Sequence, residues 1–219
     1  IKFSTPLYNV SSKILIKDEK SGGSLNSTMV ALTGLDLMSS NESVEDKIEL
    51  IKSHSLLEQL VRDLNLHTSV YDESGFKKIE LYKEDCPLDV VCDPILIDTI
   101  SNPLKIYLKG NENKTTISIT QDDKAFSEYS TKEFPCIFKT PYGNLIFKTK
   151  EKLPENFEYL ITIENVQNKA NEYLSLLSIS PVEKYSHVII LNYTDNIPQR
   201  GEDILNKLVE LYNQDAIND

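Results

Sequence analysis

The chain has no tryptophan and is poor in the residues that build most active sites, with three cysteines, three histidines and seven glycines among 219 residues. Cys86, Cys92 and Cys136 form no C-x-x-C pair, and no histidine stands at zinc-ligand spacing, so no metal site is expected. The odd number of cysteines leaves two interpretations open: small buried hydrophobic groups, or a disulfide between Cys86 and Cys92.

Glycine-rich phosphate loops and nucleophilic triads are also missing. A nucleotide-binding loop needs closely spaced glycines, because glycine lets backbone N–H groups close on phosphate, and the one adjacent pair is Gly22 with Gly23. His54, His67 and His187 have no nucleophile-elbow motif nearby, which favours surface or capping roles for them. We therefore expect no cofactor and no catalytic histidine.

Carboxylates are abundant, and two adjacent pairs were considered for glycosidase-type acid and base chemistry. These are Glu84 with Asp85 and Asp122 with Asp123. Adjacent acidic residues at turns are usually solvated, so we predict that this segment is not an enzyme and assign it no catalytic residue.

Positive charge is scarce: 23 Lys and Arg against 34 Asp and Glu give a net charge of −11. Nucleic acid is excluded as a partner, because its phosphates are bound by clustered cations. No apolar run reaches the roughly 20 residues that span a bilayer. The sequence opens at Ile1 in a strand-like pattern and is still helical at Asp219, so we expect a segment of a larger protein.

The first third of the chain carries one strand pattern and two helical patterns. Leu7–Lys17 alternates apolar and polar residues as a half-buried strand does, and Leu25–Met38 is typical of a short helix or a helical turn with a loop. Helical spacing over Glu42–Leu66 shifts phase near Ser53. This shift predicts two helices, the second starting at a capping box over Ser55–Glu58.

The middle of the chain is rich in short alternating runs separated by turn residues. The predicted strands are Ile79–Tyr82, Leu88–Val91, Leu104–Leu108, Thr116–Ile119, Cys136–Phe138 and Leu145–Phe147. They follow one another too closely for crossover helices, so antiparallel pairing in a small sandwich or barrel is expected.

Helices return in the last third. A strand at Tyr159–Ile163 precedes a helical stripe from Val166 to Leu177, a strand follows at Val188–Leu191, and a last helix begins near Pro198, where proline suits the first turn. This order predicts an α+β protein. Its base domain would comprise residues 1–75 and 157–219, and residues 76–156 would form a β-rich insertion.

Three stretches resemble the Wzz-type chain-length determinants and bacterial tyrosine autokinases, together called polysaccharide co-polymerases. Pro6–Ile16 looks like the family's first strand, which follows its first transmembrane helix. Val44–Ser53 is similar to a family helix that ends at a serine before a second helix. The most specific match is Asp195–Gly201 with the apolar stripe up to Asn213, which resembles the closing motif in which a proline-led turn enters a long helix.

The resemblance implies a ferredoxin-like base domain with a mixed sheet and flanking helices. It also implies an inner-membrane protein whose extracytoplasmic domain faces the periplasm and assembles side by side into a homo-oligomeric ring. The partners would be the polysaccharide polymerase and export machinery for capsule or exopolysaccharide. The insert, with Tyr71, Ile79–Tyr82 and Pro87, resembles the versions in Bacteroidetes. Any tyrosine kinase domain would lie outside these residues.

Two sets of contact residues follow from this interpretation. The expected oligomer interface uses Glu45, Glu49, Lys52, Arg200, Leu208 and Tyr212, with Arg200 as an ion-pair partner. Packing of Leu208 and Tyr212 on their own sheet is an equally open alternative. A second hypothesis is a carbohydrate-binding or adhesin-like β module that contacts glycan through Tyr107, Tyr129 and Tyr142, although core packing also explains such aromatic residues.

Overall fold

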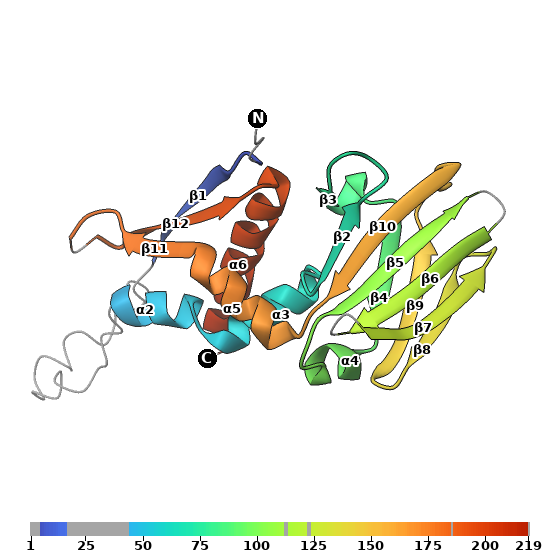
Figure 1. Ribbon diagram of the computed structural model, residues 1–219. Helices are drawn as coiled ribbons and strands as arrows, with labels where there is room; N and C mark the ends of the chain where they lie inside the picture. Colours follow the sequence, from blue (N-terminus) through green and yellow to red (C-terminus); the bar gives the residue numbers. More distant parts are fainter. Residues whose placement is uncertain (1–4, 17–43, 112–113, 122–123, 185, 219) are drawn as a thin grey trace, which may run out of the picture. The chain divides into compact units, whose positions relative to one another are not determined.

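The computed structural model describes residues 5–16, 44–111, 114–121, 124–184 and 186–218. They form an α+β protein, as predicted, and the chain divides into two compact units (Figure 1). Unit 1 contains both ends of the chain, Ile1–Leu56 and Ser175–Asp219, and unit 2 is Leu57–Leu174. The expected helix or loop at 25–38 lies outside the described residues.

Unit 1 is built on a small antiparallel sheet. Its elements are β1 (Tyr8–Leu15), α2 (Val44–Ile51), β11 (Leu177–Pro181), β12 (Val188–Asp195) and α6 (Pro198–Asn218). The strand order is β1-β12-β11, with every described pair antiparallel where a mixed sheet was expected. Alternate residues of β12, namely Ile189, Leu191 and Tyr193, are almost fully buried, and α6 packs against β1 and β12. Successive side chains of a strand point to opposite faces of the sheet, so an alternation of apolar and polar residues buries one face and favours a strand.

The predicted break between two helices near Ser53 is confirmed. Helix α2 ends at Ile51 and α3 (His54–Asp63) begins three residues later. The expected capping box was placed too late, because α3 starts at His54 and Ser55 therefore lies inside the first turn. Helix α5 (Val166–Leu176) matches the predicted helical stripe. Together α3 and α5 carry the chain between the two units.

Unit 2 contains two antiparallel sheets, of order β3-β2-β10-β5-β6-β7 and β4-β9-β8. Their strands are β2 (Thr68–Asp72), β3 (Ile79–Leu81), β4 (Leu88–Cys92), β5 (Leu104–Asn111), β6 (Lys114–Gln121), β7 (Lys124–Thr131), β8 (Cys136–Thr140), β9 (Gly143–Thr149) and β10 (Asn156–Ile163). A short 3₁₀ helix, η2 (Lys83–Asp85), and α4 (Pro94–Thr99) connect them. Figure 1 shows the two sheets stacked as a sandwich, as the strand spacing predicted.

The core of unit 2 lies between these sheets. Ile106, Ile117 and Ile119 of the larger sheet are fully buried, and so are Leu145 and Phe147 of the smaller one. Each such side chain contributes roughly 1.5–3 kcal/mol by leaving water. The sandwich is therefore held mainly by apolar side chains that alternate along β5, β6 and β9.

The structure divides the chain at different points from those expected at residues 75 and 157. Strand β10 pairs with β2 on one side and with β5 on the other, so all three belong to one sheet. The predicted strand Tyr159–Ile163 and residues 68–72, both assigned to the base domain, are thus part of the sandwich. Strand β2, together with β7, β11 and α4, was not predicted from the sequence.

The cysteines do not form the bridge that was one of the two options. All three are free, and Cys86 and Cys92 flank the extended strand β4. A strand advances about 3.3 Å per residue, whereas bridged Cα atoms lie within about 7 Å, so the two thiols cannot meet.

Glycine in β5 provides a test of this packing. A Cβ atom at Gly110 would lie 2.7 Å from the Phe157 ring and 2.8 Å from the Lys114 carbonyl oxygen, whereas one at Gly75 would meet nothing within 4 Å. We expect Gly110→Ala to lower the free energy of unfolding by about 1–3 kcal/mol, because backbone atoms must move. Gly75→Ala is the matched control. Equal unfolding midpoints in urea for the two variants would contradict this packing.

Candidate functional site

The helix α2 places the expected interface residues on its outer surface. Glu45 and Glu49 are exposed, while Ile48 and Ile51 face the interior of unit 1. Lys52 is half-buried, and its Nζ lies 4.0 Å from Glu49 Oε1, at the limit of an ion pair. A pair of this kind contributes at most about 1 kcal/mol. The exposed face of α2 is thus acidic, with Glu45, Asp46 and Glu49 on it.

Arg200 is committed to a partner in its own chain. Its Nε and Nη2 lie 2.8 and 2.7 Å from the two carboxylate oxygens of Asp195, and Nη2 also donates to the Asn196 side chain at 3.0 Å. Asp195 is buried and accepts a third hydrogen bond from the Ile197 backbone N–H at 2.9 Å. This carboxylate therefore fixes the turn that leads from β12 into α6, with Arg200 balancing its charge.

Two other expected interface residues, both in α6, point inward. Leu208 is fully buried and Tyr212 retains 9% of its exposure. Both residues therefore fit the alternative left open by the sequence, in which they pack inside their own chain. Of the six expected interface residues, Glu45 and Glu49 are the two that are exposed.

The three tyrosines considered for glycan contact do not share a surface. In the strand register Tyr107 faces Ser118, and Tyr129 faces Ile117, the next residue along β6, so the two rings lie on opposite faces of the larger sheet. Tyr129 packs edge-on against Phe138, with ring centroids 6.2 Å apart. Tyr107 alone points outward from the sandwich.

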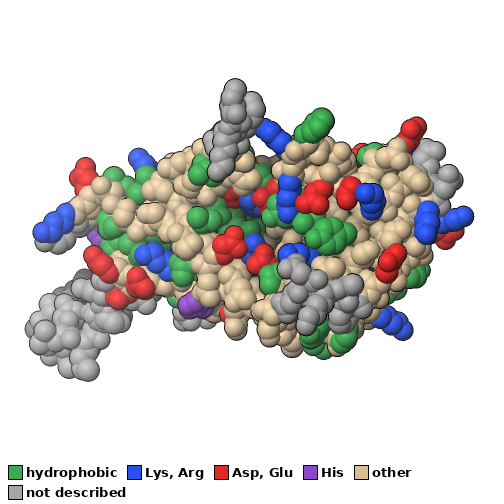
Figure 2. Space-filling view, in the orientation of Figure 1, with side chains coloured by type: hydrophobic (Ala, Val, Ile, Leu, Met, Phe, Trp, Pro, Cys, Tyr) green, Lys and Arg blue, Asp and Glu red, His purple; other side chains and the backbone are tan. Residues whose placement is uncertain are grey.

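Tyr142 lies in the turn between β8 and β9. Its hydroxyl is 3.4 Å from the Gln121 side-chain oxygen at the end of β6, so the ring helps to join the two sheets. On the outer face, Tyr107 stands in one cross-strand row with Leu160 and Tyr71, and it is 36% exposed. Figure 2 shows hydrophobic side chains on the visible face interspersed with Lys, Asp and Glu.

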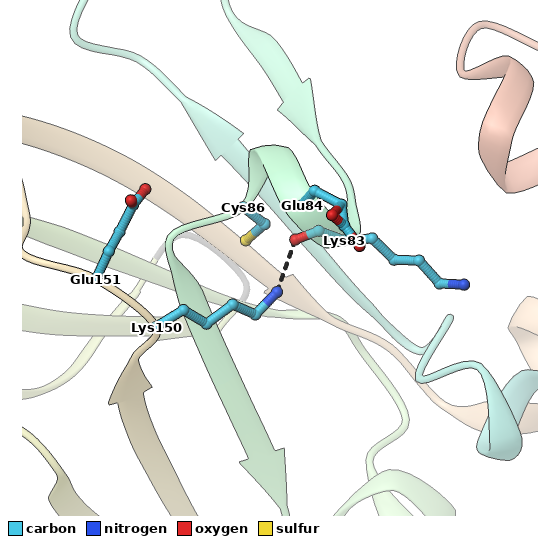
Figure 3. Close-up of a pocket in the computed structure, with 5 residues that line it drawn as sticks. All are labelled: Lys83, Glu84, Cys86, Lys150 and Glu151. Carbon is cyan, nitrogen blue, oxygen red and sulfur yellow. Dashed lines mark hydrogen bonds between the residues drawn. The ribbon is translucent and has the colours of Figure 1, made fainter.

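A hollow of about 480 Å³ opens beside η2 in unit 2. It is lined by Lys83, Glu84, Cys86, Lys150 and Glu151, drawn in Figure 3. Lys83 has a φ of 45°, an uncommon left-handed conformation for lysine, and its carbonyl accepts a hydrogen bond from Lys150 Nζ at 2.6 Å. Lys150, which follows β9, thus holds this turn in place.

The hollow brings together one thiol, two ammonium groups and two carboxylates. Burial raises the pKa of the Cys86 thiol, which donates to the Leu88 carbonyl at 3.2 Å, so the sulfur stays protonated and is a poor nucleophile. Glu84 and Glu151 lie on opposite sides of the Lys150 contact in Figure 3. Two ammonium groups and two carboxylates leave no net charge to select an ionic ligand.

The thiols of Cys92 and Cys136 also have raised pKa values. Burial raises the pKa of Cys92 to about 11 and also raises that of Cys136. Within the described ranges, no three Cys, His, Asp or Glu side chains cluster so that they could hold a metal ion. Asp122 and Asp123 lie outside the described residues, and Glu84 and Asp85 are exposed on η2.

One expectation about the histidines was wrong. His54 and His187 are exposed, but His67, for which a surface or capping role was expected, is only 4% exposed. It follows α3 and precedes β2, where its burial results from strand pairing that the local sequence does not reveal.

The Asp195 turn yields a stability prediction. Arg200→Ala should lower the free energy of unfolding by about 3–5 kcal/mol, because it leaves a buried carboxylate without a counter-charge. Lys109→Ala, which breaks the exposed Lys109–Glu158 pair on β5, should cost no more than about 1 kcal/mol. Denaturant unfolding compares the two, and similar losses would contradict a structural role for Arg200.

No protein-family model matches the chain, and no curated protein matches it in sequence. The family resemblance therefore depends on the opening strand, the α2–α3 break and the Asp195–Gly201 segment themselves.

Proposed function

We propose that this chain is the extracytoplasmic scaffold domain of an inner-membrane protein for chain-length control and export of capsular or exopolysaccharide. It acts by forming a homo-oligomeric ring on the periplasmic side and itself carries no catalytic site. Flanking transmembrane helices would hold it at both ends. No helix in the described part of the chain combines the length and apolar character needed to cross a bilayer.

The observation that carries this proposal is the meeting of distant segments in unit 1. Strand β1, from the start of the chain, pairs along its whole length with β12, and α6 packs on both. The opening strand and the Asp195–Gly201 turn, which carry much of the resemblance, are thus neighbours. The opening strand and the last helix therefore belong to one small unit, as the resemblance implies for the base domain.

The finer fold assignment belongs to the same proposal. A ferredoxin-like base would use β1, β11 and β12 as its sheet, with α2 and α6 packed on it. The antiparallel pairing and the helical cover are compatible with such a base. The sandwich of unit 2 would be the family's variable insertion.

The proposed contact surface is the exposed acidic face of α2. Copies tethered to one membrane are concentrated in two dimensions, so weak contacts are enough to close a ring. In a head-to-tail ring, Glu45 and Glu49 would meet a different, basic surface of the neighbouring copy. Since both carboxylates are exposed in the single chain, their pairing would disturb no contact inside unit 1 other than the weak Lys52–Glu49 pair.

Photo-cross-linking in native membranes tests the scaffold. A benzophenone amino acid replacing Glu49 in the full-length protein should give a ladder of multimers, whereas the same probe replacing Lys139 on β8 serves as a control. The double charge reversal Glu45→Lys with Glu49→Lys should reduce the ladder several-fold and broaden the polysaccharide length distribution. Monomers alone, with probes at several positions of α2, would refute the scaffold.

Glycan binding is the second candidate function, and the outward position of Tyr107 is the observation in its favour. An exposed ring on a flat sheet can stack on a sugar. If so, purified polysaccharide should shift the NMR signals of Tyr107 and its neighbours, and Tyr107→Ala should abolish saturable binding while Tyr129→Ala preserves it. Absence of any saturable shift would rule out this candidate.

A further inference from the structure

The segment around His67 forms a closed polar circuit at one end of unit 2. Helix α3 ends in a left-handed Asn65 with φ 53°, and the hydrogen bonds Leu66 N–H to Val61 O, 2.9 Å, and Asn65 N–H to Arg62 O, 3.1 Å, complete a Schellman motif. The next residue is His67, which leads directly into β2.

His67 links the entry of the chain into the sandwich to its exit. Its backbone carbonyl accepts a hydrogen bond from the Glu164 N–H at 2.9 Å, just beyond the β10 residue that pairs with the start of β2. Asn165 then caps α5 through the Gln167 N–H at 2.9 Å and donates its side-chain amide to the Asp98 carbonyl at 3.0 Å.

Asp98 of α4 closes the circuit by pairing with Arg62 of α3 at 2.5 Å. Four segments thus meet around one imidazole. We use the name His67 corner for Arg62, His67, Asp98, Glu164 and Asn165.

The surroundings of the His67 imidazole provide a hydrogen-bond acceptor for one ring N–H but not for two. It donates to the Val61 carbonyl, and its Nδ1 is buried without any hydrogen-bond partner. A second proton on Nδ1 would create a buried N–H without an acceptor, on a cation removed from water.

The charged neighbours do not compensate for this cost. Arg62 on α3 repels an imidazolium, and Asp98 on α4, which would attract one, is already paired with Arg62. On the exit segment, the Glu164 side chain is bound by the ammonium of Lys169 at 2.9 Å. From β4, the Cys92 thiol near Thr68 is neutral, because burial raises its pKa to about 11.

From this geometry we infer that the His67 corner is an acid-sensitive clasp, which opens locally when His67 is protonated and frees the entry and exit strands of unit 2. The neutral imidazole holds the clasp closed. Opening would release the hydrogen bonds from Thr68 and Glu164 before the β5–β6 ladder is broken.

The direction with pH follows from proton linkage. Burial lowers the pKa of His67 from 6.5 to about 4 in the closed corner. The open form therefore binds the proton more tightly, so the stability of the clasp is complete above pH 6.5 and declines as the pH falls from 6.5 to 4. At pH 5 the equilibrium constant for opening should be about 30-fold larger than at pH 7.5.

Residue-resolved amide hydrogen exchange, corrected for intrinsic rates, tests the clasp in the whole 219-residue chain. The amides of Thr68 and Glu164 should open more often than those of Ile106 and Ile117 at both pH values. Their opening should increase by about 30-fold at pH 5. Proton NMR of the His67 imidazole should show titration well below pH 6.5.

Two variants provide the control. His67→Gln keeps a donor for the Val61 carbonyl and should abolish the acid-induced increase, whereas His54→Gln should retain it. The clasp is refuted if Thr68 and Glu164 exchange only together with the β5–β6 ladder, if the increase persists in His67→Gln, or if His67 titrates near 6.5. The two wild-type measurements decide the matter even if His67→Gln does not fold.

Discussion

The antiparallel pairing of β2 with β10 is the interaction on which unit 2 depends. In the sequence β2 follows α3 and β10 precedes α5, the two helices in which the chain passes between the units. Their register places Thr68 opposite Ile163. Once this pair forms, β10 presents its other edge to β5, and the larger sheet can be completed by hairpins. The paired residues are nearly a hundred positions apart in the sequence, and closing so long a loop is costly in entropy.

Buried polar groups appear where the chain changes direction, and each has a defined role. At the end of β12, Asp195 accepts three hydrogen bonds, two from its ion-pair partner Arg200 and one from the Ile197 N–H, and so starts α6. At the end of α3, His67 accepts one neighbour through its backbone and donates to another through its ring. Both are turns that apolar packing alone cannot specify, because hydrophobic contact has no preferred direction.

Much of the fold could be predicted from local patterns. Alternation identified β1, β5, β6 and β12, and helical periodicity with its phase shift identified α2 and α3, because each pattern reflects burial on one face of a single element. Strand β2 was missed because its five residues are held by β10 rather than by their own alternation. Strand β7 is a polar edge strand with the same difficulty.

The candidate sites were less predictable. Exposure of Glu45 and Glu49 followed from the helical phase of α2, but the pairing of Arg200 with Asp195 required the turn between them. A local signal existed: an aspartate three residues before a proline marks an Asx turn at a helix start. The burial of His67 had no such signal, since it results from the pairing of β2 with β10, which is distant in the sequence.

The adjacency of Thr68 and Ile163 has a consequence for how such a protein can diversify. A module whose first and last strands are hydrogen-bonded neighbours begins and ends at nearly the same point in space. It could be shortened to a simple turn, or replaced by an unrelated domain, without stretching the chain that carries it. Replacing the sandwich by another domain would therefore leave the connectivity of the remainder of the molecule unchanged.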